Sequence, residues 1–324
     1  MKIAIAGGTS PTLGHAIVSA LLRNPHNTPV ILSRSATSFD PTAPSSTTTL
    51  YGAELRHVDY TDPHSLVAAL HDIHTVISVI KQADPAAMAA TQTALLSAAV
   101  AAGVKRFAPS EFGVGAAGLV AATADKERVW AACRASGLEV ARFRCGLFMN
   151  YLALGGREFG SAVAREKACA GLADAAPVIW DFEAGVAELP VGPDGRAPRV
   201  TLTEIDDVGR FVAAACGLTE GTWVEEMGMV GETIGLEDVV QLVRECLGVD
   251  LKVKRVGRDE LERRVASVDG IGRTREEVFR KMIAQIELVM LEEKEGWGII
   301  EPVLNEMCLH TKPLSVREYL QNYR

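Results

Sequence analysis

The sequence predicts an α/β fold, in which a doubly wound parallel sheet is joined to a smaller, mostly helical region. Three observations predict it. Short apolar runs alternate with longer helical patterns through the first half of the chain, as in a parallel sheet covered by helices on both faces. A glycine-rich segment joins the first apolar run to the first helical pattern. The 324 residues, 48% of them apolar, can bury one large core or two interlocked ones.

The first half of the chain contains the patterns of six strands and four helices. Short apolar runs bounded by turn-forming residues predict strands at Lys2–Ala6, Val30–Ser33, Glu54–Val58, Thr75–Ser78, Arg106–Ala108 and Glu139–Arg144. Apolar residues at helical spacing predict helices at Leu13–Leu22, Pro63–Leu70, Pro85–Ala101 and Lys126–Ala135. Helices of this length serve as right-handed crossovers between parallel strands.

The regular alternation ends near residue 150, where prolines and glycines become frequent. We therefore expect a first domain over residues 1–150 and a second region over 151–324. A strand pattern at Arg199–Thr203, followed by the apolar run Phe211–Ala215, indicates that the chain returns to the first sheet over about residues 198–218.

The last third of the chain is expected to be largely helical. Apolar residues recur at helical spacing over Leu236–Leu247 and Thr274–Lys294. The second of these segments could be a lid or a subunit contact, such as a homodimer interface, and the pattern does not choose between them.

Composition excludes several classes of protein. The net charge of −8 without a basic stripe argues against a nucleic-acid-binding surface. The six cysteines and seven histidines show no metal-ligand spacing, so we expect no metal and no metal-dependent hydrolase. No segment resembles a signal peptide or a membrane span, and we expect a cytoplasmic location with no membrane partner.

The segment Gly7–Gly14 has the context of a dinucleotide-binding turn, because it follows the first strand and opens the first helix. Glycines let the backbone approach a pyrophosphate, and the helix N-terminus supplies free N–H groups. Pro11 stands where one spacing would place the middle glycine, and it has no N–H to donate. Candidate contacts with the cofactor are Gly7, Thr9, Ser10, Pro11, Thr12 and Leu13. A glycine-rich turn that binds nothing is the alternative.

The end of the second predicted strand indicates which dinucleotide is bound. Arg34 follows Ser33 and lies twenty residues after Gly14, where an NAD-dependent enzyme would carry an acid for the ribose hydroxyls. A cation there suits a 2′-phosphate, with Ser33 as a further contact, so NADPH is the expected cofactor. The alternative for Arg34 is an exposed loop charge.

The fifth predicted strand leads into Ser110 and Glu111, at the edge of the sheet where ligands bind. Lys126 begins the next helix, so its amine can reach the same crevice. Burial and a cationic cofactor ring would favour a neutral amine able to move a proton. The alternatives are a solvated lysine at a helix start and, for Glu111, a structural or helix-capping carboxylate. Short-chain dehydrogenases use a tyrosine four residues before such a lysine, and here that residue is Ala122.

The run from Arg106 to Gly113, RFAPSEFG, resembles the signature of the isoflavone reductase-like branch of the atypical short-chain dehydrogenases, part of the wider NmrA-like family. Val76–Ser78, the Gly-Pro-Asp-Gly turn at 192–195 and the Glu-Ile-Asp-Asp-Val element at 204–208 agree with this resemblance, which spans about residues 2–215. The glycine turn resembles a fungal-type variant. The missing tyrosine is expected in this branch, which includes phenylcoumaran benzylic ether reductase and pinoresinol–lariciresinol reductase.

The resemblance implies an NADPH-dependent oxidoreductase with a Rossmann fold, active in secondary metabolism, whose Lys126 acts as general acid/base. Hydride would pass to an aromatic or conjugated molecule, such as a phenylpropanoid or isoflavonoid. It adds Ser78, Ser110, Glu111, Phe112 and Lys126 to the cofactor site. Members usually carry a lysine after the arginine, but no lysine occurs between Arg34 and Lys81, so the preference for NADPH rests on Arg34.

Six residues could form the wall of a substrate pocket: Phe112, Phe148, Met149, Tyr151, Trp180 and Phe182. For each of them, core packing is the alternative. The alternative function is an NmrA-like redox sensor or transcriptional co-regulator that binds the dinucleotide without turnover. Such sensors often lack the lysine, and its presence here favours an enzyme.

Overall fold

A computed structural model describes residues 1–34, 49–115, 119–156, 159–172, 176–267, 274–294 and 297–324. Its largest sheet has seven strands in the order β3-β4-β2-β1-β5-β6-β7. Their bounds are β1 Lys2–Ala6, β2 Thr28–Ser33, β3 Thr49–Leu50, β4 Ala53–His57, β5 Thr75–Ser78, β6 Arg106–Ala108 and β7 Glu139–Val140. Neighbouring strands are parallel except in the short hairpin between β3 and β4. The predicted doubly wound sheet is confirmed.

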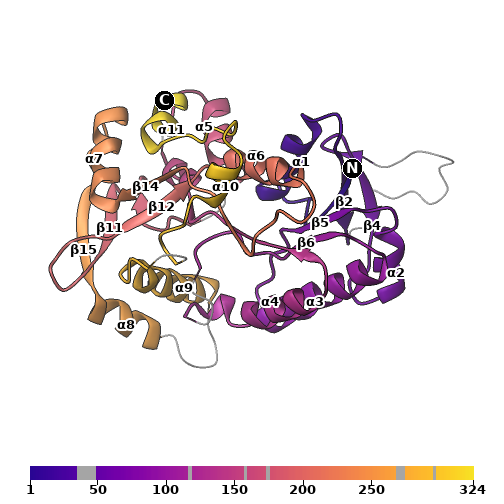
Figure 1. Ribbon diagram of the computed structural model, residues 1–324. Coiled ribbons are helices and arrows are strands. Elements are labelled where there is room, and N and C mark those ends of the chain that lie inside the picture. Colours follow the sequence, from indigo (N-terminus) through magenta and orange to yellow (C-terminus); the bar gives the residue numbers. More distant parts are fainter. Residues whose placement is uncertain (35–48, 116–118, 157–158, 173–175, 268–273, 295–296) are drawn as a thin grey trace.

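Helices cover both faces of this sheet (Figure 1). One face carries α2, α3 and α4, and the other carries α1 and α6. Their bounds are α1 Leu13–Leu22, α2 Pro63–Ala69, α3 Pro85–Ala101, α4 Lys126–Ala135 and α6 Ile205–Cys216. Asp62 and Asp84 cap α2 and α3 by accepting hydrogen bonds from backbone N–H groups, and a proline opens each helix. Local sequence therefore fixes where these helices begin.

The predicted strand over residues 139–144 is divided at Ala141. Its first part, β7, pairs with β6, and its second part, β8 (Arg142–Arg144), pairs in parallel with β13 (Glu226–Gly228). The two parts therefore belong to different sheets. β13, which the sequence did not predict, brings a late segment of the chain next to β8.

The segment Arg199–Thr203 forms the predicted strand, β12, but it does not join the seven-stranded sheet. One edge of β12 pairs with β9 (Leu147–Phe148) and the other with β14 (Glu232–Gly235), so neither edge is left for the seven-stranded sheet. The chain was expected to return to the first sheet over about residues 198–218. The strand β12 does not pair with that sheet, whereas the helix after it, α6, packs against α1 on one of its faces.

The remaining helical elements are η1 Ala121–Thr123, which precedes α4, and then η2 Met149–Ala153, α5 Ala162–Cys169, α7 Leu236–Leu247, α8 Arg258–Ala266, α9 Arg275–Met290, α10 Val303–Met307 and α11 Val316–Asn322. A further sheet has the order β10-β11-β15, with bounds Trp180–Asp181, Val186–Val191 and Lys252–Gly257. The predicted helix over 236–247 is confirmed, and the one expected over 274–294 is shorter, ending at Met290.

Gly209 sets how closely α6 approaches α1. A Cβ atom at this position would lie 2.5 Å from the carbonyl oxygen of Ala16, which is helix backbone and cannot turn aside. We expect Gly209→Ala to destabilise the fold by about 2 to 3 kcal/mol, since overpacking would push the two helices apart. Denaturant unfolding measures this. The control is Gly257→Ala, where no atom lies within 4 Å of the added methyl group; an equal loss there would contradict the explanation.

Glu287 on α9 is a buried carboxyl group, 2% exposed, and one of its oxygens has no hydrogen-bond partner. Burial, followed by repulsion from Glu188, raises its pKa from 4.5 to about 8. The folded state therefore holds a proton that the unfolded chain loses near pH 4.5, and stability falls as the pH rises from about 4.5 to 8.

Glu287→Gln removes the carboxyl group whose ionisation lowers stability as the pH rises. We therefore expect the melting temperature of this variant to rise by about 3 to 5 °C at pH 8 and by less at pH 5. Thermal unfolding at both pH values measures the difference. Glu276→Gln, an exposed residue of the same helix, is the control and should change neither value appreciably. A gain for Glu287→Gln that is the same at both pH values would contradict the proposed titration.

Candidate active site

The turn between β1 and α1 is closely packed. Gly7 has a φ of +85°, and a Cβ at Gly14 would lie 2.8 Å from the carbonyl oxygen of Gly7. Both positions therefore require glycine. The Ser10 and Thr12 hydroxyl groups are hydrogen-bonded to each other at 2.7 Å. Pro11 supplies no N–H, and the two hydroxyls lie on either side of it, just before α1 begins.

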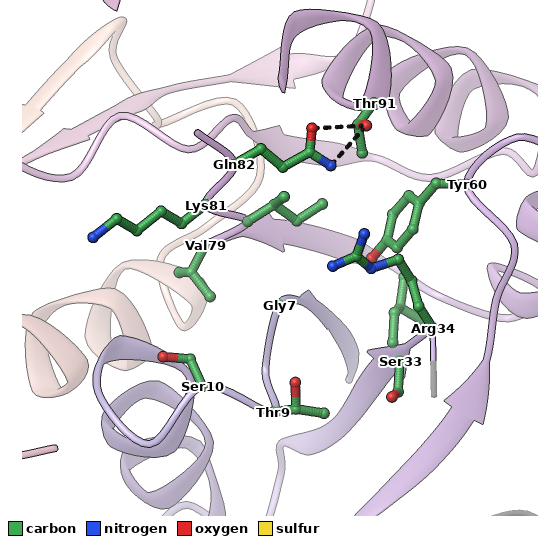
Figure 2. A pocket seen from close by; sticks show the side chains of 12 residues that line it. Gly7, Thr9, Ser10, Ser33, Arg34, Tyr60, Val79, Lys81, Gln82 and Thr91 are labelled. Carbon is green, nitrogen blue, oxygen red and sulfur yellow. Dashed lines mark hydrogen bonds between the residues drawn. The ribbon is translucent and has the colours of Figure 1, made fainter. Parts of the chain in front are cut away.

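A pocket of about 210 Å³ lies over this turn (Figure 2). Of the predicted cofactor-binding residues, it brings together Gly7, Thr9, Ser10, Ser33 and Arg34. It is also lined by Leu32, Tyr60, Val79, Ile80, Lys81, Gln82 and Thr91, which the sequence analysis did not propose. Most of these residues follow β4 and β5, so their position at the carboxyl ends of parallel strands was the available signal.

Eight other predicted cofactor-binding residues do not line this pocket: Pro11, Thr12, Leu13, Ser78, Ser110, Glu111, Phe112 and Lys126. Leu13 packs against the core beneath α1. Ser78 is buried, and its hydroxyl accepts a hydrogen bond of 2.9 Å from the side-chain amide of Gln92. Thr91 and Gln92 are consecutive residues of α3, and Gln92 lines the next cavity along the sheet. The two cavities are thus neighbours.

This second cavity, of about 20 Å³, lies at the carboxyl end of β6. It is lined by Ser110, Glu111 and Lys126, together with residues of α3 and α4. The Lys126 Nζ lies 3.3 Å from an Oε atom of Glu111, whose residue is only 3% exposed. The lysine side chain keeps 22% of its surface exposed. A cationic donor is thus fixed at the edge of the sheet where ligands bind.

Charged side chains link this pair to the neighbouring strands. The Arg144 guanidinium lies 3.8 Å from the same Glu111 oxygen and 2.9 Å from the Glu226 carboxylate of β13. Glu226 also pairs with Arg142, which lies 2.9 Å from Glu127, the residue after Lys126. The first turn of α4, β8 and β13 are therefore joined by alternating charges, which restrict the position of the Lys126 backbone. Next to Arg144, burial raises the pKa of the Cys145 thiol to about 12, which disfavours the thiolate form.

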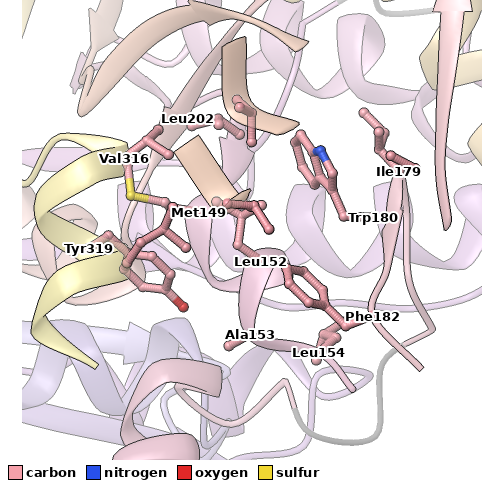
Figure 3. Close-up of a cluster of buried hydrophobic side chains, with 14 of the residues drawn as sticks. Met149, Leu152, Ala153, Leu154, Ile179, Trp180, Phe182, Leu202, Val316 and Tyr319 are labelled. Atoms are coloured by element: carbon pink, nitrogen blue, oxygen red, sulfur yellow. The ribbon is translucent and has the colours of Figure 1, made fainter. Parts of the chain in front are cut away.

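The six aromatic and sulfur-containing side chains proposed for a substrate pocket fall into two groups. Phe112, Phe148 and Tyr151 are half-buried; Phe148 stacks on Tyr151 with ring centres 6.4 Å apart. Met149, Trp180 and Phe182 are buried in the core of the second region (Figure 3). Only the first group could meet a ligand without a rearrangement of the core.

Helix α9 packs over the segment that precedes Lys126. The Ala121 backbone N–H donates a hydrogen bond to the Gln285 side chain at 3.2 Å, and the Gly115 N–H donates to the Trp297 carbonyl at 3.0 Å. One face of α9 is thus occupied within this chain.

The described ranges contain no group of three His, Cys, Asp or Glu side chains arranged to hold a metal. None of their helices combines the length and apolarity needed to cross a membrane.

A protein-family model and two curated relatives match this chain. The model of the NmrA-like family matches residues 1–320. Oxidoreductase BOA1 from Botryotinia fuckeliana is 26% identical over 263 residues, 76% of each chain, and an isoflavone reductase homolog from Solanum tuberosum is 38% identical over 115 residues, 35% of each chain.

Two solved structures share the fold over nearly their whole length. AtPrR2 with NADP+ and (+)pinoresinol has a TM-score of 0.70 at 18% identity, covering 100% of this chain and 98% of the other. The leucoanthocyanidin reductase–NADPH complex from Vitis vinifera has a TM-score of 0.69 at 16% identity, covering 100% and 99%. At this level of identity the likeness establishes the fold, which is that of NAD(P)-binding Rossmann proteins.

Proposed function

Because the chain belongs to the NmrA-like family, we propose that it is an NADPH-dependent reductase of the isoflavone reductase-like type. It would transfer hydride to an aromatic or conjugated small molecule. The observation that carries this proposal is the amine of Lys126, which Glu111 holds at the carboxyl end of β6, one strand away from the pocket over the glycine turn. Relatives described as an oxidoreductase and as an isoflavone reductase homolog support it.

The residues of the larger pocket fit NADPH. Gly7 in its left-handed conformation brings backbone to the floor of the pocket, where a pyrophosphate needs close approach. Arg34 is exposed and lines this pocket, and its guanidinium would donate charge-assisted hydrogen bonds to a 2′-phosphate. Tyr60 contributes a hydroxyl group without a hydrogen-bond partner.

When bound, NADPH supplies the hydride. Lys126 supplies the proton: its ammonium group would donate to the substrate oxygen that gains negative charge as the neighbouring carbon is reduced, and would then take a proton from water. Glu111 holds the amine through an ion pair and offsets its charge. The half-buried rings of Phe112, Phe148 and Tyr151 would present apolar surface to an aromatic substrate.

The alternative is a sensor that binds the dinucleotide without turnover. One observation favours it: Lys126 already has a partner in Glu111, and such an ion pair can serve structure alone. The two functions differ in whether bound NADPH is consumed.

The deciding experiment measures NADPH oxidation in the presence of a broad panel of phenolic and polyketide-like carbonyls and ethers. A reductase oxidises NADPH with at least one member of the panel. Tight dinucleotide binding with no oxidation across the panel would favour the sensor. Weak binding of both NADPH and NADH would contradict both functions.

A further inference from the structure

The end of the larger pocket nearest β2 and β4 contains a pair of side chains that the sequence did not predict to lie together. Arg34 follows β2 directly, and Tyr60 lies three residues after β4. Both line the pocket, and in Figure 2 the phenol oxygen of Tyr60 is directed toward the Arg34 guanidinium. The amine of Lys81 points to the opposite side of the glycine turn. Lys81 therefore does not supply a second cation beside Arg34.

The Tyr60 hydroxyl is buried and has no hydrogen-bond partner. Of the buried side-chain atoms without a partner in the described part of the chain, it is the one that belongs to a residue lining this pocket. An unsatisfied buried hydroxyl is unfavourable, so such groups call for a ligand or another explanation. Burial raises the pKa of Tyr60 above its ordinary value, which keeps the hydroxyl protonated and able to donate.

We propose that the Tyr60 hydroxyl, together with the Arg34 guanidinium, binds the 2′-phosphate of the dinucleotide and so contributes to the choice between NADPH and NADH. This inference rests on the proposed binding of NADPH. A phosphate monoester presents three acceptor oxygens and close to two negative charges, more than one guanidinium satisfies. A phenol O–H can donate a charge-assisted hydrogen bond to one of the remaining oxygens.

A purely apolar contact between the Tyr60 ring and the dinucleotide would predict a different pattern of NADPH and NADH affinities. If the Tyr60 ring only packed against the adenine base, its hydroxyl would be dispensable, and NADPH and NADH would be affected alike. Phenylalanine separates the two cases, because it keeps the ring and removes one oxygen atom.

The test is isothermal titration calorimetry of the full chain and its Tyr60→Phe variant with NADPH, NADH, adenosine 2′,5′-bisphosphate and 5′-AMP. We expect Tyr60→Phe to weaken NADPH and the bisphosphate about tenfold, and to leave NADH and 5′-AMP within about twofold. Tyr323→Phe, near the C-terminus and outside the pocket, is the matched control and should change none of these affinities. The melting temperature of Tyr60→Phe should not fall, because the lost hydroxyl stabilises nothing in the free protein.

Other outcomes are equally decisive. If the parent protein binds NADPH tightly and Tyr60→Phe keeps the same ratio of NADPH to NADH affinity, the assignment of Tyr60 is wrong while the proposed function stands. Equal losses for both dinucleotides would also overturn it in favour of ring packing. If the parent protein binds neither dinucleotide, the proposed function fails, and this assignment fails with it.

Discussion

Lys126→Ala is expected to lower the rate of substrate-dependent NADPH oxidation by about a thousandfold, because positioned general acids typically contribute 10²- to 10⁴-fold. NADPH affinity should stay near that of the parent protein, since the amine lies in the cavity at the end of β6 and not in the pocket over the glycine turn. Steady-state kinetics and calorimetry on the same preparations measure the two quantities.

Two further variants make this test specific. Lys126→Arg keeps a positive charge beside Glu111, but a guanidinium does not release its proton, so activity should stay low. Lys105→Ala removes an exposed lysine next to the first residue of β6, at the other end of the strand, and should leave turnover unchanged. Unchanged turnover in Lys126→Ala would remove the proposed proton donor. A large loss of NADPH affinity in the same variant would instead make Lys126 a cofactor contact.

Local sequence predicted the bounds of four helices. These are α1, α3, α4 and α7. In α3 both ends are marked in the sequence, because Asp84 caps its first turn, Pro85 opens it, and Gly103 follows its end in a left-handed conformation. The sequence also singled out the residues of the larger pocket that follow β1 and β2, because their spacing is set within one strand–turn–helix unit.

Features that depend on distant segments were not predictable in the same way. β13 is three residues long, too short to show a period, and it pairs with β8 across more than eighty positions of sequence. Tyr60 lines the pocket of Arg34 from the loop after β4, and Thr91 lines it from α3. The separation of buried Trp180 from half-buried Tyr151 is decided by core packing, since both are aromatic residues with the same local pattern.

Arg34→Glu is expected to reverse the preference for the dinucleotide. The guanidinium now faces the pocket, so a 2′-phosphate would gain charge-assisted hydrogen bonds there. A carboxylate at this position would repel the phosphate and could accept hydrogen bonds from the two ribose hydroxyls of NADH. We expect the ratio of NADPH to NADH affinity to fall by about a hundredfold or more, equivalent to about 3 kcal/mol.

The matched control is Arg23→Glu, which makes the same change of charge at an exposed position where α1 ends. If the two variants lower NADPH affinity equally, the effect is one of net charge and not of a specific contact. Because the repulsion is between exposed charges, the shift in the Arg34 variant should shrink as salt rises from 50 to about 500 mM, whereas a gain in NADH affinity through hydrogen bonds should persist. An affinity ratio that Arg34→Glu leaves unchanged would place the 2′-phosphate elsewhere, and the preference for NADPH would then lose its only cationic support at the end of β2.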